Sequence, residues 1–351
     1  MKKRNKMARI IFIITLCFVF FGCTIAALEI YSSSFGRVEE FPENEFFPYH
    51  RYKEIDQYKY PREEVHFNSC GNKLQGFIYG NGNNNGLVVI SEGLGGTADD
   101  YLPMIMYFAG KGWRVFAFNN TGVSGSEGES VRGLSQSVID LDAALTYIEN
   151  SDKFAGLSVM LAGHSWGGHA VCAVLNYNHR VSAVVSFAGY NKGSDMIKEN
   201  GVSMVGGFFY IFTPQMRALE KQLFGDTANL TAVGGINKSG IPVMIVQCSD
   251  DNAIKPGTTS IYAHRKEITN PHVEIIYRDG EDATGHEYTF CSKAQKEYYN
   301  WANKSWETYK AENKNATKLQ WANVINFDKD LVNELDPDLM ERINVLYNNA
   351  K

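Results

Sequence analysis

Short apolar runs rich in β-branched residues alternate with longer amphipathic stretches along most of the chain. The apolar runs cover residues 87–91, 114–118, 158–162, 183–187, 243–247 and 273–277. The amphipathic stretches that follow them include residues 101–109, 131–148, 166–175 and 292–312. Repeated strand and helix units of these lengths predict a mostly parallel sheet with helices on both faces. Ahead of them, residues 64–79 alternate apolar and polar side chains around a turn, which predicts an antiparallel hairpin.

The segment 191–240 interrupts this alternation, and its apolar, aromatic centre at Gly206–Phe212 predicts a lid inserted between two strands. We expect four parts along the chain: a signal anchor or signal peptide at 1–28, a stalk at 29–62 that packs back on the domain, an α/β domain at 63–313, and a helical extension at 314–351. Within the extension, residues 328–347 are predicted to form one amphipathic helix.

The N-terminus combines a basic flank with an apolar run of membrane length. Five basic residues lie within the first nine positions, and no other charge occurs before Glu29. About 20 apolar residues span a bilayer, and positive charge stays on the cytoplasmic side. We therefore predict a membrane anchor with an extracytoplasmic catalytic domain. A cleaved export signal with a secreted product stays open, and Gly22-Cys23 faintly resembles a lipoprotein processing site.

Charge and motif content exclude several classes of function. Without the basic flank, 29 Lys and Arg face 39 Asp and Glu, a net charge of about −10 that repels nucleic acid. The six cysteines have no C-x-x-C spacing, although a single Cys248–Cys291 bridge stays open. We find no dinucleotide fingerprint, no phosphate-binding loop of the Walker type and no histidine pair with metal spacing. The sequence therefore predicts neither a cofactor nor a metal.

The chain has one G-x-S-x-G sequence, at Gly163–Gly167, between the predicted strand 158–162 and the predicted helix that follows. On a sharp strand-to-helix turn, the small glycines let the two elements approach closely and expose the serine hydroxyl above the sheet. We therefore predict that Ser165 is a nucleophile and that the N–H of Trp166 contributes to an oxyanion hole. The alternative is a glycine-rich turn with an incidental serine.

A serine nucleophile requires a general base, and the base requires a carboxylate. Two loops at strand ends can supply them: Cys248–Ile254, which contains Asp250 and Asp251, and Asp279–His286. Both loops follow predicted parallel strands, so they are expected to meet at the carboxyl edge of the sheet. We predict His286 as the base. At this stage either aspartate could be the acid, or could simply cap the following turn.

These motifs resemble the α/β-hydrolase superfamily over about residues 64–312, in particular its lipases, esterases and serine aminopeptidases. In that superfamily the acid lies in a G-x-x-D-x-x-[IV] pattern, which implies Asp251, with Cys248 in place of the glycine. The loop Ser91–Gly96 resembles the H-G-x-G-G loop and implies the N–H of Leu94 as the second oxyanion donor. Glu92 stands where the family often has histidine, so a negative charge is expected near this loop. The alternative for this loop is an ordinary strand-to-helix connection.

The resemblance implies a serine hydrolase that forms an acyl-enzyme intermediate. Because the lid is apolar, we expect a carboxylic ester, an acyl compound or a short peptide as substrate, with ester hydrolysis preferred. The alternatives are a serine aminopeptidase or amidase of the same fold, and a non-catalytic binding protein at the cell surface.

Overall fold

One eight-stranded sheet forms the centre of the molecule in the computed structural model, which describes residues 2–42 and 45–351. Its strands are β1 (Arg62–Ser69), β2 (Asn72–Tyr79), β3 (Leu87–Ser91), β4 (Arg114–Phe118), β5 (Val159–His164), β6 (Val181–Phe187), β7 (Val243–Cys248) and β8 (Val273–Arg278). Their order is β1-β2-β4-β3-β5-β6-β7-β8. The β1–β2 and β2–β4 pairs are antiparallel and all others are parallel. The predicted hairpin and parallel sheet are thus confirmed.

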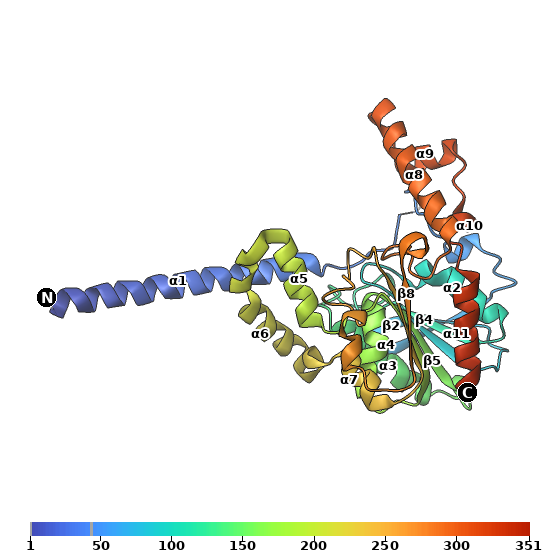
Figure 1. The fold of residues 1–351 in the computed structure, drawn as a ribbon, viewed down its shortest axis with the longest axis horizontal. Helices are drawn as coiled ribbons and strands as arrows, with labels where there is room; N and C mark the ends of the chain where they lie inside the picture. The colour runs from blue at the N-terminus through green and yellow to red at the C-terminus, as the bar shows by residue number, and fades with distance from the viewer. Residues whose placement is uncertain (1, 43–44) are drawn as a thin grey trace.

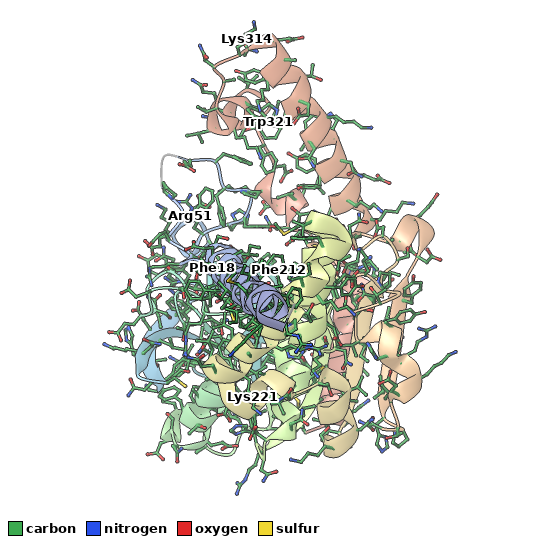
Figure 2. The ribbon with its side chains drawn as sticks, turned by 90° about the vertical axis from the view of Figure 1, so that its left-hand side faces the viewer. Phe18, Arg51, Phe212, Lys221, Lys314 and Trp321 are labelled. Atoms are coloured by element: carbon green, nitrogen blue, oxygen red, sulfur yellow. The ribbon has the colours of Figure 1, made fainter. Side chains whose placement is uncertain are left out.

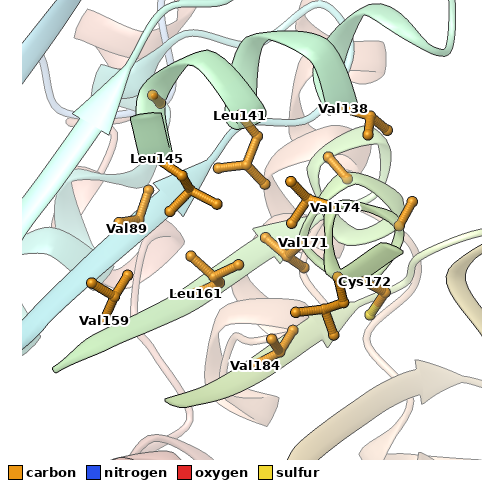
Figure 3. Close-up of a cluster of buried hydrophobic side chains, with 14 of the residues drawn as sticks. Val89, Val138, Leu141, Leu145, Val159, Leu161, Val171, Cys172, Val174 and Val184 are labelled. Atoms are coloured by element: carbon orange, nitrogen blue, oxygen red, sulfur yellow. The ribbon is translucent and has the colours of Figure 1, made fainter. Parts of the chain in front are cut away.

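Helices cover both faces of the sheet. On one face lie α3 (Gln136–Glu149), α4 (Trp166–Ala173) and α7 (Ala232–Ser239), and on the other lie α2 (Leu102–Gly110) and α11 (Pro337–Asn349). Successive strand residues alternate between the two cores: Leu161 packs under α3 and α4 (Figure 3), whereas Met160 and Ala162 face α2 and α11. Side chains buried on both faces explain why the strands are almost continuously apolar.

The predicted lid insertion begins with α5 (Gly193–Val205), a 3₁₀ segment at Gly206–Ile211 and α6 (Thr213–Phe224). A second 3₁₀ segment at Gly225–Asn229 leads into α7. Because α7 buries Ala232, Val233 and Ile236 against the sheet, only the part up to Asn229 stands outside the core. The lid is therefore shorter than the interval 191–240.

The N-terminal helix α1 (Lys2–Ser34) is longer than the expected anchor and projects from the body (Figure 1). It is the one helix in the described chain that is long and apolar enough to cross a membrane. The expected stalk at 29–62 therefore begins as helix, and its extended part starts after Ser34. That part packs back on the domain as predicted: the N–H of Val38 donates to Gly122 O at 2.9 Å, and Arg37 donates to the carbonyl of Gly128 at 2.8 Å.

The C-terminal region differs from its prediction. In place of one helix at 328–347 there are α10 (Lys329–Val332) and α11, separated by Asn333–Asp336. Asp336 caps α11 by accepting the N–H groups of Asp338 and Leu339, and Pro337 stands at the first helical position. Proline disfavours the continuation of a preceding helix, which is why the single helix predicted at 328–347 is interrupted before Pro337.

The core also extends beyond the expected boundary at residue 313. Leu339, Met340, Ile343 and Tyr347 of α11 are buried in the core with α2, and the hydroxyl of Tyr347 donates to Leu161 O at 2.6 Å. By contrast, α8 (Lys293–Glu312) and α9 (Lys318–Val324) form an arm that projects from the body (Figure 1). The arm has a small apolar cluster of its own around Trp321.

We predict that Met340→Ala lowers the free energy of unfolding by about 2–5 kcal/mol, because it leaves a cavity under α11 in a close-packed core. Denaturant-induced unfolding followed by circular dichroism measures this change. Val345→Ala, at an exposed position of the same helix, is the matched control and should change the free energy by less than about 0.5 kcal/mol. Equal, small effects of both variants would contradict the assignment of α11 to the core.

Candidate active site

Ser165 lies on the turn between β5 and α4, with a backbone φ of 55° and ψ of −109°. This left-handed conformation is unfavourable for a residue other than glycine and persists only when the surroundings impose it. The N–H of Ser165 donates to Phe187 O at 2.8 Å, which ties the turn to β6. A Cβ atom at Gly167 would lie 2.1 Å from Ser91 O, so only glycine lets α4 approach β3 this closely. The sharp turn predicted from G-x-S-x-G is present.

The structure brings Ser165, His286 and Asp251 into one hydrogen-bonded line. Ser165 Oγ lies 2.9 Å from His286 Nε2, and His286 Nδ1 lies 2.9 Å from Asp251 Oδ2. With its Nδ1 proton donated to Asp251, the imidazole has its Nε2 free to accept the serine proton. Asp251 is 2% exposed, which keeps the carboxylate away from competing water. These three groups can therefore act as nucleophile, base and acid.

The structure also separates the roles of the two neighbouring aspartates. Asp251 Oδ2 accepts from Gln247 Nε2 at 3.0 Å, and its Oδ1 accepts the N–H groups of Ala253 and Ile254. It thus caps the local turn and contacts His286 at the same time. Asp250 instead accepts the N–H of Gly285 at 2.9 Å and pairs with Lys296 at 3.2 Å. It therefore holds the His286 loop without contacting the imidazole.

His164, which precedes the serine, connects three loops of the site. The N–H of Gly93 donates to the hydroxyl of Tyr101 at 2.8 Å, and this hydroxyl lies 3.0 Å from His164 Nδ1. His164 Nε2 lies 2.9 Å from the carbonyl oxygen of His286. Burial, and secondarily the charge of His286, lowers the pKa of His164 to about 3, so the ring is neutral. A neutral ring can accept from Tyr101 and donate to His286, which fixes the loops relative to each other.

His169, which also lies close to Ser165 in the chain, has a packing role: its ring is buried and stacks on Tyr190 with 4.3 Å between centroids. No role was assigned to His164 from the sequence. Its partners come from three separate chain segments, and no local sequence pattern joins them.

A cavity of about 270 Å³ opens beside Ser165 and His286, and Leu94 lines it. Aromatic side chains form much of its wall: Tyr288 and Phe290 from the histidine loop, and Phe41, Phe47 and Tyr49 from the stalk. The sequence did not predict that the stalk contributes to the site. Trp166 stands at the first position of α4, next to Ser165, and its side chain is buried. Of the two expected oxyanion residues, Leu94 thus lines the cavity that contains Ser165, and Trp166 follows Ser165 directly in the chain.

Two carboxyl groups also line this cavity, Asp100 and Glu287. Burial raises the pKa of Asp100 to about 7, although Thr97 stabilises its charged form through backbone and side-chain hydrogen bonds. Near neutral pH, Asp100 is therefore only partly ionised. The cavity wall carries less negative charge than the sequence alone implies.

Glu92 belongs to the Ser91–Gly96 loop, and its side chain is buried rather than exposed in the cavity. Its Oε1 accepts the backbone N–H of Asn120 at 2.8 Å and the side-chain amide of Asn120 at 3.0 Å. Complete burial raises the pKa of Glu92 well above its ordinary value, which favours the neutral form of the side chain. Burial thus opposes the negative charge expected near the Ser91–Gly96 loop, and the carboxyl group ties this loop to the one after β4.

Among the residues that the structure describes, no group of three His, Cys, Asp or Glu side chains is arranged to hold a metal ion. All six cysteines in that part of the chain are free. The Cys248–Cys291 bridge that the sequence left open is not formed, although both thiols are buried. Cys248 Sγ instead lies 3.6 Å from the hydroxyl of Thr284.

We predict that Glu92→Gln is more stable than the wild type at pH 7 and that this difference shrinks towards pH 5. A carboxyl whose pKa is raised by folding stabilises the native state at low pH, and this contribution is lost as the pH rises above the ordinary pKa of 4.5. The slope is at most on the order of 1 kcal/mol per pH unit. Unfolding in urea between pH 5 and pH 8 measures it, with exposed Glu312→Gln as control. If the stability advantage of Glu92→Gln over the wild type stayed constant or fell as the pH rose, the raised pKa of Glu92 would be contradicted.

Comparisons with known proteins agree with this fold. A family model described as serine aminopeptidase, S33, matches residues 82–233, which include Ser165 but neither Asp251 nor His286. The structure is similar to that of the esterase Pf2001 of Pyrococcus furiosus, with a TM-score of 0.52 and 14% identity over 74% of this chain and 95% of that chain. Est1E from Butyrivibrio proteoclasticus with bound ferulic acid gives a TM-score of 0.50 and 17% identity, over 64% of this chain and 91% of that chain. A search of curated protein sequences finds no match. The chain has an α/β-hydrolase fold, and its residues 82–233 are similar to the serine aminopeptidase family.

Proposed function

We propose that this protein is a serine hydrolase that cleaves carboxylic esters through an acyl-enzyme intermediate. The observation that carries the proposal is the line from Ser165 Oγ through His286 to Asp251, with both distances at 2.9 Å. A strained serine next to an oriented imidazole matches the requirements of nucleophilic catalysis. The buried carboxylate supplies the third group, which stabilises the imidazolium formed during reaction.

In the proposed mechanism, Ser165 Oγ attacks the ester carbonyl carbon while His286 Nε2 takes the hydroxyl proton. The negative charge that develops on the carbonyl oxygen is stabilised by the N–H groups of Leu94 and Trp166. Collapse of this intermediate breaks the bond to the alcohol, which leaves with the proton from His286. Water then attacks the acyl group with His286 again as base, and the acid is released. No cofactor takes part in these steps.

The chemistry of the cavity favours an ester with an apolar acyl group. Phe41, Phe47 and Phe290 line it next to Ser165, and apolar walls select substrates by the apolar surface they bury. The similar structures reported above include an esterase. These observations support an acyl ester over a polar substrate.

An aminopeptidase or amidase activity is the second candidate, and two observations favour it. The matching family model is described as a serine aminopeptidase, and the carboxyl groups of Asp100 and Glu287 could attract the amine of a peptide. Parallel assays of a short chromogenic ester and a chromogenic aminoacyl amide distinguish the two activities. Non-catalytic binding is the third candidate.

We also propose that α1 anchors the protein in a membrane with the hydrolase domain outside the cytoplasm. Within its span Lys6–Ser34, an 18-residue window has a mean hydropathy of 2.7, and the basic residues of the N-terminus precede this apolar window. A helix of this length exceeds the h-region of a cleaved signal, which supports the anchor over a secreted form.

We predict that the full-length wild type in detergent reacts with a fluorophosphonate probe and that Ser165→Ala and His286→Ala both lose this labelling. The probe reacts with a serine only when a base activates it. Labelling is read by in-gel fluorescence, with circular dichroism to establish folding. A folded wild type that does not label would refute the hydrolase proposal and leave non-catalytic binding as the function.

We predict that Asp251→Asn lowers kcat/KM for a short ester by about 10³–10⁴-fold, because an amide cannot stabilise the imidazolium or hold its tautomer. Asp250→Asn is the matched control. Since Asp250 contacts Gly285 rather than the imidazole, we expect a loss of less than about tenfold. The reverse order of the two effects would assign the acid to Asp250.

A further inference from the structure

The final turns of α1 pack against the lid rather than standing free of it. Ala27, Tyr31 and Phe35 are buried in one apolar cluster with lid residues that include Phe209, Phe212 and Met216. The hydroxyl of Tyr31 donates to Glu220 of α6, and Ser135 donates to the same carboxyl group at 3.1 Å. Figures 1 and 2 both show the lid beside the base of α1, with Phe212 next to the helix in the end-on view. The lid and the helix therefore form one unit.

The length of the apolar run in α1 indicates how far a bilayer would extend along the helix towards the lid. The uncharged apolar run extends from Ile10 to Leu28, 19 residues. At 1.5 Å per residue this run is roughly 28 Å long, about the thickness of the hydrocarbon core. Contacts with the lid cluster begin at Cys23, five residues before the run ends. A bilayer that covers the run must therefore reach the lid.

The part of the lid that faces away from the body is apolar and exposed. We call the exposed large side chains Met204, Val205, Phe208, Tyr210 and Ile211 the lid tip; each is between 48% and 74% exposed. No charged residue occurs between Glu199 and Arg217. A contiguous apolar surface of this kind is costly in water and marks an interaction site. Its position beside the membrane-length helix indicates a lipid surface.

A second cavity leads from the lid tip towards the candidate active site. It has a volume of about 370 Å³ between the base of α1 and α5, and its lining includes Tyr31, Phe35, Met204 and Phe209. Leu94 lines this cavity and also the cavity that contains Ser165. An acyl chain that entered between α1 and the lid would thus reach the oxyanion loop without crossing water.

We propose that the lid tip inserts into the non-cytoplasmic leaflet of the bilayer that α1 spans, and that the substrate is a long-chain ester dissolved in that leaflet. The ester enters laterally, through the cavity between α1 and α5. The hydrolytic step rests on the hydrolase function proposed above, whereas the insertion of the lid tip rests only on the proposed membrane anchor.

Quenching by brominated lipids tests the insertion without any catalytic step. Full-length Phe208→Trp is reconstituted in phosphatidylcholine vesicles, and its added tryptophan emission is compared with the wild type. We expect brominated acyl chains to quench at least about half of this added emission. Val324→Trp is the control: Val324 is 68% exposed in the arm, and the arm lies on the side of the body away from the projecting N-terminus of α1 in Figure 1, so its emission should not be quenched. Equal emission of Phe208→Trp in brominated and ordinary vesicles would overturn the proposal.

A pair of substrates then tests the lateral route. Phe208→Asp combined with Ile211→Asp places charge on the lid tip at two positions that line neither cavity. We expect at least tenfold slower hydrolysis of a long-chain ester in vesicles, with hydrolysis of a short water-soluble ester within about twofold of the wild type. Equal rates on the vesicle ester, or equal losses on both esters, would overturn the route. If the wild type hydrolyses neither ester, the proposed hydrolase function fails, and the quenching result still decides the insertion.

Discussion

The close approach of α4 to β3 and β5 is the constraint on which the site depends. A Cβ atom at Gly163 would lie 2.3 Å from Gly167 O, so neither position has room for a side chain. This contact forces the turn to reverse within one residue, and Ser165 takes the left-handed conformation that results. The strain costs on the order of 1–3 kcal/mol and persists because the buried sheet on both sides fixes the backbone. The serine hydroxyl is thus placed by backbone packing, before any of its own hydrogen bonds form.

Hydrogen bonds between loops then set the remaining geometry. Tyr101 and His164 join the oxyanion loop to the histidine loop, Glu92 joins the oxyanion loop to Asn120, and Asp250 holds Gly285. Apart from the exposed Asp250, these polar groups are buried or partly buried, where a hydrogen bond is worth more than in water and an unmade one is costly. Because burial favours the neutral forms of His164 and Glu92, the network orients the site and adds little net charge beside a developing oxyanion.

The N-terminal helix and the lid share an apolar cluster that also contains Trp166, the residue after the candidate nucleophile. Packing at the base of α1 is therefore continuous with packing at the site. A lid exposed to water would usually carry a polar outer face. Here the lid tip is apolar, and none of the 17 residues between Glu199 and Arg217 is charged. Under our proposals, α1 and the lid together attach the protein to the membrane and admit the substrate.

The sequence alone was sufficient for the sheet, because alternating strand and helix periods are local and each apolar run is buried on both faces. It also identified Ser165 and the two loops at strand ends, since parallel topology alone brings the carboxyl ends of strands to one edge. The family resemblance implied Asp251 as the acid, but the residue types alone did not distinguish it from Asp250. Their different partners depend on how two loops far apart in sequence meet.

Other features were decided only by tertiary structure. The raised pKa of Glu92 depends on burial, which no residue letter reveals, and the role of His164 depends on partners from three segments. The core assignment of α11 was missed because an amphipathic period shows that a face is buried but not against what. Local periodicity therefore determined which elements form and where reactive residues stand on them. Long-range packing determined their charge states, their partners and the surface that the lid presents.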